Sequence, residues 1–565
     1  MLDVFPPFLV YFLGAALLPL VPKGHLRSAL SLLVPAIGGW LIWTMPTGVH
    51  DVVQLMGVDL TLIRHDKLAA VFALIFSLAA FTSLLYACHV RDTVQTIATL
   101  LYAGSAIGAV FAGDLITLFL FWEGTAIASV FLIWARQTEG AYHSGMRYLI
   151  FQVTSGVILL AGAALFWRET GTMAFERMTL GSPATWLIFL AFGIKCAFPL
   201  LHTWLTDAYP SATVTGSVVL SIFTTKLAIY ALARGFAGTE TLIYIGAVMA
   251  LFPIFYGMVE NDLRRVLSYS LIGQLGFLVV GVGIGTDLAL NGVAAHAVAS
   301  VLYKSLLFMS VGAVLYRTGT AKATELGGLY RTMPLTALMC LVGAATISAV
   351  PLFASFATKS MILSAAGYKG YEGAWLVLII AAAATVVYTG VKVPYCAFFG
   401  ADSGKRPKEA PWNMLGGMAI TAGFCIAIGI WPQTFFAFLP YDVDYAVYTT
   451  SHVVTQLQLV AFSMLAFFLL LRVGLYPLAT GSVTLDADWI YRRLLPGVIG
   501  AIANVVSALW TRGADIQQRW VHALILRLYK THGPEGRVAR VVPTGSMVQW
   551  VAILLGVMLI VTFVS

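Results

Sequence analysis

The chain has 565 residues, of which 60% are hydrophobic and 10% are charged, and its formal net charge is +8. Because soluble domains contain roughly 25% charged residues, this composition excludes a soluble globular protein and indicates a polytopic protein in a lipid bilayer. Nothing in the composition points to a nucleic acid partner.

Apolar stretches long enough to cross about 30 Å of hydrocarbon predict sixteen membrane-spanning helices. The first stretch lacks a basic flank and a small-residue cleavage site, so we interpret it as a retained helix and not as a signal peptide. In chain order, the predicted spans are 5–22, 26–46, 68–90, 94–112, 115–135, 146–167, 184–206, 212–233, 241–259, 266–286, 288–315, 334–366, 373–398, 413–437, 452–471 and 547–564.

Lysine and arginine residues outside these spans fall mainly on one side of the predicted membrane. Of 28 such residues, 22 lie in odd-numbered connections, counting the segment from Arg472 to Arg540 among them, and six lie in even-numbered connections. Since basic residues accumulate in cytoplasmic loops, we expect the odd-numbered connections in the cytoplasm of a bacterial inner membrane and both termini outside.

The segment 485–545 precedes the last span and contains an apolar run, 497–510, that is too short to cross a bilayer. Its apolar positions form one helical stripe, and a crossing here would carry six basic residues to the outer side. We predict an amphipathic lateral helix on the cytoplasmic face, which serves either as a surface anchor or as a docking arm for neighbouring subunits.

Five charged residues lie deep inside separate predicted spans: Glu123, Lys195, Lys226, Lys304 and Lys359. At about 2.5–3.5 kcal/mol for each charge at the membrane centre, the five would cost roughly 12–17 kcal/mol. A structural ion pair or a snorkelling side chain explains one such lysine, but five charges on five helices indicate a function. Lys392, near the cytoplasmic end of its span, is expected to snorkel.

The four central lysines outnumber the single acid, so they cannot all form ion pairs. Burial and mutual repulsion disfavour the charged form of an amine, which lets it gain and lose a proton. Glu123 supplies the opposite charge, and its pairing with a lysine would alter the protonation of the neighbours. We interpret the set as a proton relay.

His296, Ser300 and Lys304 recur every four residues and predict a polar stripe on one helix. His296 and Lys304 would lie about 12 Å apart along the helix axis, so a proton passing between them would need water or Ser300. A packing role for His296 is the alternative. Tyr303 and Tyr269 are further candidate polar steps.

Two prolines interrupt spans that carry these lysines. Pro199 has no N–H, so the carbonyl of Lys195 loses its helical partner, and Pro351 does the same to Ile347, eight residues before Lys359. Irregular backbone at membrane depth is tolerated where protein or a hydrated cavity satisfies it, so we predict broken helices beside hydrated ion pathways, with simple kinks as the alternative. His202 and Asp207, towards the cytoplasmic end, are candidates for proton uptake, with capping or loop contacts as the alternative.

The interrupted helices are the seventh and the twelfth, each the fourth in a block of five. Blocks with an odd number of helices are inverted relative to one another, the usual plan of transporters with midplane sites. The fold class we predict is an all-α polytopic membrane protein with two inverted five-helix repeats. The predicted regions are 1–112 (helices 1–4, the fourth opening the first repeat), 94–234 and 241–398 (the repeats), 413–475 (helices 14–15), 485–545 (the lateral helix) and 547–564 (the last helix).

The five cysteines form no CxxC pair, and the ten histidines show no metal-binding spacing. GVGIGTD at 281–287 lacks the strand and helix context of a dinucleotide fingerprint. We therefore expect no cofactor, no metal and no catalytic residue.

The run 193–234, GIKCAFPLLHTWLTDAYPSATVTGSVVLSIFTTKLAIYALAR, resembles the antiporter-like subunits of respiratory complex I and of the multisubunit Mrp cation/proton antiporters. Further blocks resemble this family in the same order, over roughly 65–475. They are FWEG around Glu123, MRYLIFQVTSG (146–156), HAVASVLYKSLLFMSVGAVL (296–315), LGGLYRTMP (326–334) and SAVPLFASFATKS (348–360). The lateral helix with a last span is similar to the largest antiporter-like subunit of complex I.

The resemblance implies that Glu123 and Lys195 form a switching pair, that Lys226 relays protons, and that Lys304 with His296 and then Lys359 continue the path. Two departures stand out: SATVTG after Pro210 lacks the family's second proline, and ASFATK lacks the usual glycine-phenylalanine before the lysine. These leave the charges intact and put the shape of the second break in question.

The function predicted from residues and resemblance is proton translocation by a non-enzymatic subunit of a Mrp-type Na+/H+ antiporter, with other membrane subunits, protons and Na+ as partners. The alternatives are a proton-pumping module of a redox complex such as complex I or a hydrogenase, the membrane subunit of an inorganic-carbon uptake system, and a non-conducting scaffold.

Overall fold

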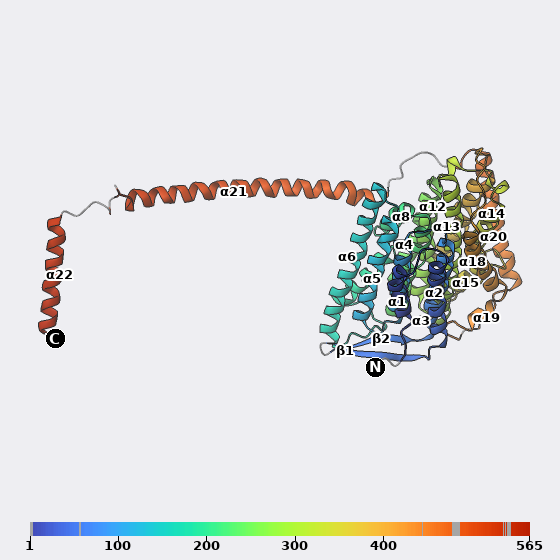
Figure 1. Ribbon diagram of the computed structural model, residues 1–565, viewed down its shortest axis with the longest axis horizontal. Coiled ribbons are helices and arrows are strands. Elements are labelled where there is room, and N and C mark those ends of the chain that lie inside the picture. Colours follow the sequence, from blue (N-terminus) through green and yellow to red (C-terminus); the bar gives the residue numbers. More distant parts are fainter. Residues whose placement is uncertain are drawn as a thin grey trace. The chain divides into compact units, whose positions relative to one another are not determined.

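The structure is a computed structural model. It describes residues 4–55, 58–442, 444–476, 486–534, 536, 538 and 544–564. Its contacts divide the chain into two units, Met1–Thr484 and Leu485–Ser565. Almost all of the regular structure is helical (Figure 1).

The first unit holds the helical bundle. Before the first predicted repeat come α1 (Pro7–Leu17), the short 3-10 helix η1 (Leu18–Leu20), α2 (His25–Thr44), the strands β1 (Gly48–Leu55) and β2 (Val58–His65), and α3 (Lys67–Ala87). The first predicted repeat holds α4 (Thr93–Phe111), α5 (Leu115–Trp134), α6 (Glu139–Thr170), α7 (Pro183–Lys195), α8 (Thr203–Ser211), α9 (Val214–Leu220) and α10 (Thr224–Gly235).

The second predicted repeat and the end of the first unit follow. They comprise α11 (Thr241–Val259), α12 (Leu263–Ile284), α13 (Asp287–Thr318), the 3-10 turns η2 (Ala323–Glu325) and η3 (Leu329–Arg331), α14 (Pro334–Ile347), α15 (Ala354–Tyr368), α16 (Glu372–Thr385), the π-helix η4 (Val386–Val391), α17 (Lys392–Pro394), the π-helix η5 (Tyr395–Phe399), α18 (Trp412–Ile430), α19 (Pro432–Phe436) and α20 (Thr450–Arg472). The second unit comprises the π-helix η6 (Ile490–Leu494), α21 (Leu495–His532) and α22 (Thr544–Val564).

Fourteen helices among the described residues are long and apolar enough to cross a membrane, and three shorter apolar helices accompany them. Every predicted span coincides with one of these helices or with two pieces of a broken one. The fourteen include Ile490–His532, which qualifies by length and composition and which the charge pattern assigns to the lateral segment. Residues 485, 535, 537 and 539–543 of that segment lie outside the described part of the chain.

Among the described residues, a β-hairpin departs from the all-α expectation. β1 and β2 pair antiparallel, with Gly48 opposite His65 and Val52 opposite Thr61. The stretch between the second and third predicted spans mixes valine with polar residues, which favours a half-buried strand. Hydropathy alone does not reveal such a strand because it is too short and too polar to be read as a span.

The helices predicted to break near Pro199 and Pro351 are interrupted in the structure. α7 ends at Lys195 and α8 begins at Thr203, while α14 ends at Ile347 and α15 begins at Ala354. Two residues beyond each helix end, Ala197 and Ala349 adopt left-handed conformations, with φ of 62° and 55°. Proline lowers the cost of leaving the helix, but the reversed backbone at alanine is what ends it.

The two breaks are closed by the same hydrogen bonds. Phe198 N donates to Gly193 O at 3.0 Å, and Val350 N donates to Ala345 O at 3.1 Å. In both breaks the residue after the proline, Leu200 or Leu352, is again left-handed, with φ of 69° and 75°. The departure of ASFATK from the family sequence therefore leaves the shape of the second break like that of the first.

Other features also recur between the predicted repeats. Asp114 caps α5 and forms a bridge with Ala174, and Asp262 caps α12 and forms a bridge with Lys322. α6 and α13 are both 32 residues long and both end before a left-handed glycine. These parallels support the predicted repeat, whose inversion stays a prediction.

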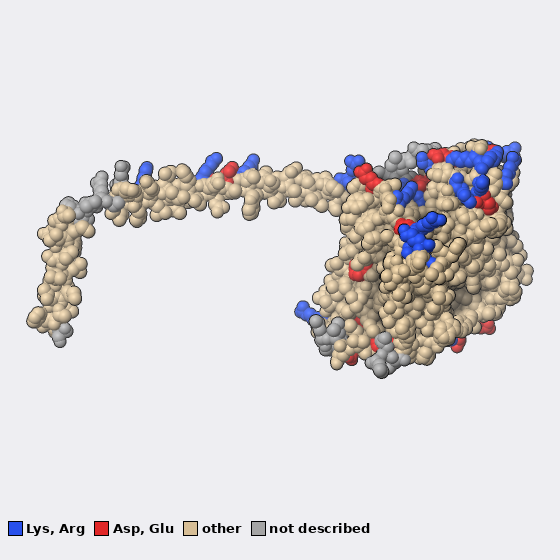
Figure 2. Space-filling view, in the orientation of Figure 1, with Lys and Arg blue, Asp and Glu red and all other residues tan. Residues whose placement is uncertain are grey.

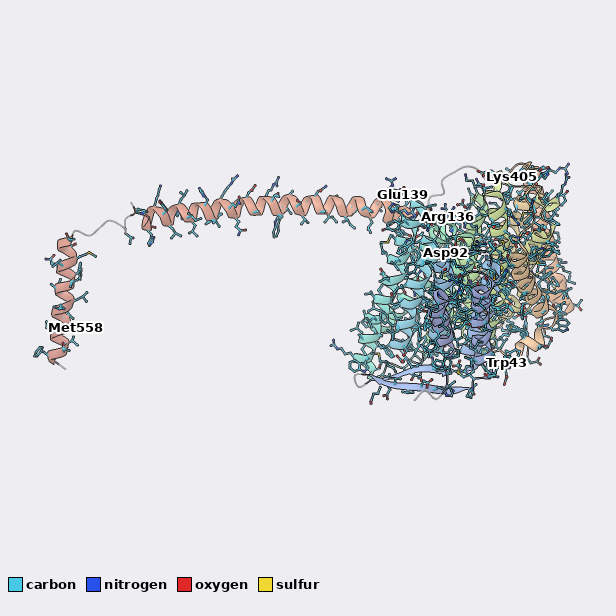
Figure 3. The ribbon with its side chains drawn as sticks, in the orientation of Figure 1. Trp43, Asp92, Arg136, Glu139, Lys405 and Met558 are labelled. Atoms are coloured by element: carbon cyan, nitrogen blue, oxygen red, sulfur yellow. The ribbon has the colours of Figure 1, made fainter. Side chains whose placement is uncertain are left out.

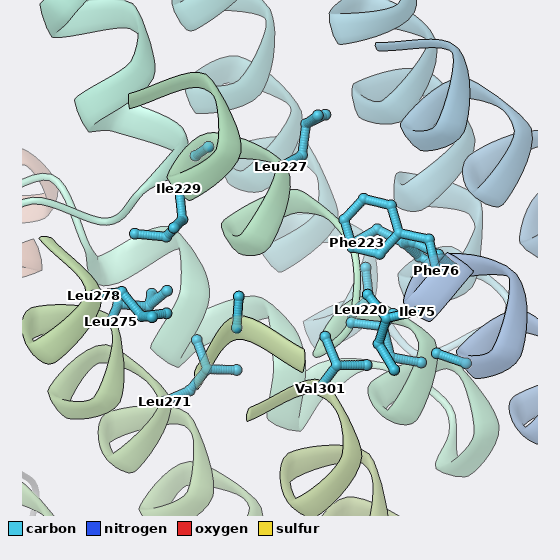
Figure 4. Close-up of a cluster of buried hydrophobic side chains, with 14 of the residues drawn as sticks. Ile75, Phe76, Leu220, Phe223, Leu227, Ile229, Leu271, Leu275, Leu278 and Val301 are labelled. Atoms are coloured by element: carbon cyan, nitrogen blue, oxygen red, sulfur yellow. The ribbon is translucent and has the colours of Figure 1, made fainter. Parts of the chain in front are cut away.

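Apolar side chains from both repeats meet in the centre of the bundle. Figure 4 shows Leu220, Phe223 and Leu227 of the first predicted repeat and Leu271 and Leu275 of the second among the buried side chains of one cluster. All five are nearly or fully buried. The charged residues of the spans are therefore set in a well-packed apolar interior, where an unpaired charge is costly.

The two ends of the bundle differ in charge. Arg136, Glu139 and Lys405 lie at one end, and Trp43 lies at the other, near the hairpin (Figure 3). Blue lysine and arginine side chains gather at the first end in the space-filling view (Figure 2). This is the end formed by the odd-numbered connections.

Candidate functional site

All the predicted relay residues lie inside the bundle. Lys195, His296 and Lys304 have no exposed surface, and Lys226 and Lys359 are 1% and 3% exposed. Glu123 is partly buried, with its Oε1 atom fully buried. The local sequence explains their helices: each lies within a long apolar run that forms a helix once packed.

Lys195 is the last residue of α7 and faces α5. Its Nζ donates to the carbonyl oxygen of Trp122 and to Thr125 Oγ1 at 3.0 Å, and lies 4.5 Å from the centre of the Trp122 ring. Trp122 is held by its own bond from Nε1 to Ser155 Oγ at 3.0 Å. The amine is thus surrounded by neutral oxygens and an aromatic face.

Glu123 lies next to this amine. The two charges interact electrostatically, but no ion pair joins the two residues in the described part of the chain. Glu123 Oε1 has no hydrogen-bond partner among the described residues. A Cβ added to Gly156 would lie 1.5 Å from this oxygen, so the glycine makes room for the carboxylate.

Lys226 lies beside a third break, which was not predicted from the sequence. α9 ends at Leu220 and α10 begins at Thr224, and Lys226 Nζ donates to the carbonyl oxygen of Ser221 at 2.8 Å. No proline or glycine lies in the interruption, so the sequence carries no breaker signal there.

His296 is connected to α15 and α12 rather than to Ser300. Its Nδ1 lies 3.0 Å from Thr358 Oγ1, and its Nε2 lies 3.5 Å from the hydroxyl of Tyr303. Tyr303 donates in turn to Gln274 Oε1 at 3.3 Å. Ser300 Oγ donates to the carbonyl oxygen of Ala297 in its own helix, so proton passage between His296 and Lys304 through water or Ser300 stays a prediction.

Lys304 has a hydroxyl partner from the neighbouring helix α12. Its Nζ donates to Ser270 Oγ at 2.6 Å, and Thr389 Oγ1 donates to the same oxygen at 2.8 Å. Ser270 and Thr389 were not predicted, because single serines and threonines in apolar helices carry no distinctive signal. Tyr269, the other suggested polar step, stacks on Tyr256 with ring centres 5.0 Å apart.

Lys359 meets the end of the broken helix α14. Its Nζ donates to the carbonyl oxygen of Ile347 at 3.3 Å and lies 4.7 Å from the centre of the Phe277 ring. From the sequence, we expect Pro351 to leave the carbonyl of Ile347 without its helical hydrogen-bond partner. The partial negative charge at a helix C-terminus favours an amine at this position.

Lys392 does not snorkel. It is fully buried, and its Nζ donates to the carbonyl oxygens of Gly257, Met258 and Glu260 at 2.7–3.0 Å, at the C-terminal end of α11. The structural interpretation of Lys392 holds in a different form, since the amine caps a helix instead of reaching the interface.

His202 and Asp207, the candidates for proton uptake, lie at α8. His202 precedes the helix, is 3% exposed and lies 4.6 Å from the Phe252 ring, centre to centre. Asp207 forms an ion pair with Arg147 of α6 at 2.7 Å. Both residues therefore have local contacts, and a route through them stays a proposal.

No group of three or more metal-ligating side chains occurs among the described residues. All five cysteines carry free thiols. The polar groups of the site are amines, one carboxylate, one imidazole and hydroxyls, a set that can accept and donate protons.

Broken helices, an apolar interior and a row of buried amines define a polytopic membrane protein. Residues 112–389 match the family model described as the transmembrane region of NADH:quinone oxidoreductase and Mrp antiporters. The resemblance seen in the sequence is thereby confirmed.

Curated relatives match beyond this region. Hydrogenase-4 component B of Escherichia coli (strain K12) is 27% identical over 495 residues, which are 75% of this chain and 71% of that protein. A component of the Na(+)/H(+) antiporter of Alkalihalophilus pseudofirmus is 27% identical over 472 residues. That match covers 74% of this chain but only 57% of the antiporter component.

Among solved structures, a chain of the membrane-bound sulfane sulfur reductase, an archaeal respiratory membrane complex, has the same fold. The TM-score is 0.72 at 19% sequence identity, and the match covers 98% of this chain and 99% of that one. The fold is thus shared over nearly the whole length.

Proposed function

We propose that the chain is a proton-translocating, antiporter-like membrane subunit. The observation that carries the proposal is that four lysine amines lie buried on neutral oxygen partners, with no carboxylate within ion-pair distance among the described residues. A buried carboxylate partner would hold each amine protonated, since removing the proton would leave an unpaired anion. A carbonyl or hydroxyl oxygen accepts a bond from either form of the amine.

The proposed order of transfer follows the chain of elements. Glu123 and Lys195 form the switch, Lys226 the bridge, His296 and Lys304 the central relay, and Lys359 the terminal group. The open Glu123–Lys195 arrangement supports a switch, because a carboxylate that is near an amine but not bonded to it can still form the pair. Pairing would favour the charged form of Lys195 and alter the field at Lys226.

Orientation and uptake are part of the proposal. The basic end of the bundle faces the cytoplasm of a bacterial inner membrane, with both termini outside. His202 and Asp207 are candidates for admitting protons from that side. The ion pair of Asp207 with Arg147 would have to open first.

The assembly we propose is a Mrp-type multisubunit Na+/H+ antiporter, in which this subunit carries protons and performs no catalysis itself. A proton-pumping module of a redox complex is the second candidate, favoured by the broad match to a hydrogenase component. Gentle purification and identification of the accompanying proteins discriminates the two: cation-antiporter subunits support the first, and redox subunits support the second.

The test of the proposed function uses Lys195→Ala and Glu123→Ala in the assembled complex. We expect both variants to assemble at normal yield and to lose proton movement, measured with a pH-sensitive dye in membrane vesicles. A non-conducting scaffold would behave in the opposite way, with reduced yield and full activity of whatever complex assembles. Wild-type proton transport in both variants would overturn the proposal.

A further inference from the structure

One face of α6 carries a polar stripe that the relay does not use. Ser144, Tyr148, Gln152 and Gly156 are spaced by four residues and therefore share that face. The stripe covers about 18 Å of the helix, at 1.5 Å per residue, from near its start to the carboxylate of Glu123. The three side chains are at most 1% exposed.

Several polar atoms along this stripe are buried without a hydrogen-bond partner among the described residues. They are Ser144 Oγ, both amide atoms of Gln152 and Glu123 Oε1. Thr203 Oγ1 and Tyr209 OH, on the helix α8 that packs against α6, are also buried without a hydrogen-bond partner among the described residues. Tyr148 is satisfied by Ser129, whose Oγ lies 2.7 Å from its hydroxyl.

Among these residues, Gln152 has the most buried polar atoms without a described partner. Its amide offers two donor hydrogens and an accepting oxygen, and none of them is used within the described part of the chain. Buried polar groups in native proteins are nearly always paired, with ordered water where the protein supplies no partner. Six buried polar atoms without a described partner lie on α6, on α8 and at Glu123 of α5. Their number and spread point to several small polar ligands rather than to one large ligand.

The direction of the stripe fits a path to Glu123. Helical side chains lean towards the helix N-terminus, so the Gln152 amide lies on the side of Gly156 that faces the start of α6. Glu123 Oε1 occupies the space over Gly156. The start of α6 is at Glu139, which Figure 3 places at the basic end of the bundle.

We propose that this face of α6 holds a file of water molecules, and that Gln152 anchors the water nearest to Glu123. The file would carry protons between the basic end of the bundle and Glu123, along α6 rather than through His202 and Asp207. This inference rests on the proposed function, because it names the route by which the switch is protonated.

The test compares Gln152→Leu with the wild type in the intact complex, reconstituted in vesicles with an internal pH-sensitive dye and an imposed pH gradient. We expect proton uptake to slow roughly tenfold, as expected when a hydrogen-bonded group is lost from the path. Gln152→Asn, which keeps an amide, should take up protons at a rate between those of the wild type and Gln152→Leu. Thr154→Val, on the exposed face of the same helix, is the matched control and should leave the rate unchanged.

A wild-type rate in Gln152→Leu would overturn the inference. Loss of uptake in Glu123→Gln, measured in the same assay, would show that the proposed function still stands; its retention would count against both. If Gln152→Leu fails to assemble, cryo-electron microscopy of the wild-type complex decides. Ordered water within hydrogen-bond distance of both Gln152 amide atoms supports the file, and a dry site or a cation bound by Gln152 and Glu123 contradicts it.

Discussion

Lys226, Lys359 and Lys392 each donate to carbonyl oxygens at the end of a helix. Such carbonyls have lost their intrahelical partners and carry the negative end of the helix dipole, so an amine there is stabilised without a carboxylate. Lys392 takes three carbonyls and has a structural role. Lys226 and Lys359 each donate to one such carbonyl, so fewer hydrogen bonds hold their amines in place.

We predict that the hydroxyl of Ser270 stabilises the buried amine of Lys304. Ser270→Ala removes the hydroxyl that accepts from Lys304 Nζ, leaving a buried amine unpaired, which costs about 1–3 kcal/mol. We expect a lower melting temperature of the purified protein, measured by thermal shift. Ser268→Ala, which removes only a bond to the carbonyl of Arg264 in the same helix, is the control. Equal melting temperatures for the two variants would contradict this role.

At the scale of elements, the two broken helices end in the same way. Each terminates in a 6→1 backbone bond around a left-handed alanine, a position where glycine is usual. Left-handed alanine costs roughly 1–2 kcal/mol, so the surrounding packing holds the backbone in a strained form. The break places the end of α7 beside α5 and the end of α14 beside Lys359.

Ala197→Gly should relieve that strain. Glycine adopts φ near +62° without a Cβ penalty, so we expect an unchanged or raised melting temperature. Ala191→Gly, within α7 and equally buried, should instead lose about 1 kcal/mol because glycine is a poor helix former. If both substitutions lowered the melting temperature equally, the left-handed cap would not be the source of strain.

Much of this architecture could be predicted from the sequence. Long apolar runs predict spans because hydrocarbon requires them, and buried charges are conspicuous against such runs. The hydroxyl partners Ser270 and Thr358 could not be predicted, since they lie on other helices and their residue types are common. The break beside Lys226 and the reversed backbone at Ala197 and Ala349 depend on tertiary packing, which outweighs local propensity.

At the scale of the whole molecule, the two predicted repeats differ at one equivalent position. Counting from the start of each 32-residue helix, Gly156 of α6 corresponds to Lys304 of α13. In the first repeat that position is empty and receives the carboxylate of Glu123; in the second it carries the amine itself. A related fold thus presents opposite charges at equivalent places along the proposed path.

The most direct test of the relay is the rate of proton uptake by the assembled complex carrying Lys304→Met. Methionine keeps the length of the side chain and removes the proton-carrying group at the centre of the path. We expect normal assembly, measured by the yield of co-purified subunits, and loss of proton uptake into vesicles under an imposed pH gradient. Uptake at the wild-type rate in that variant would contradict the proposed relay.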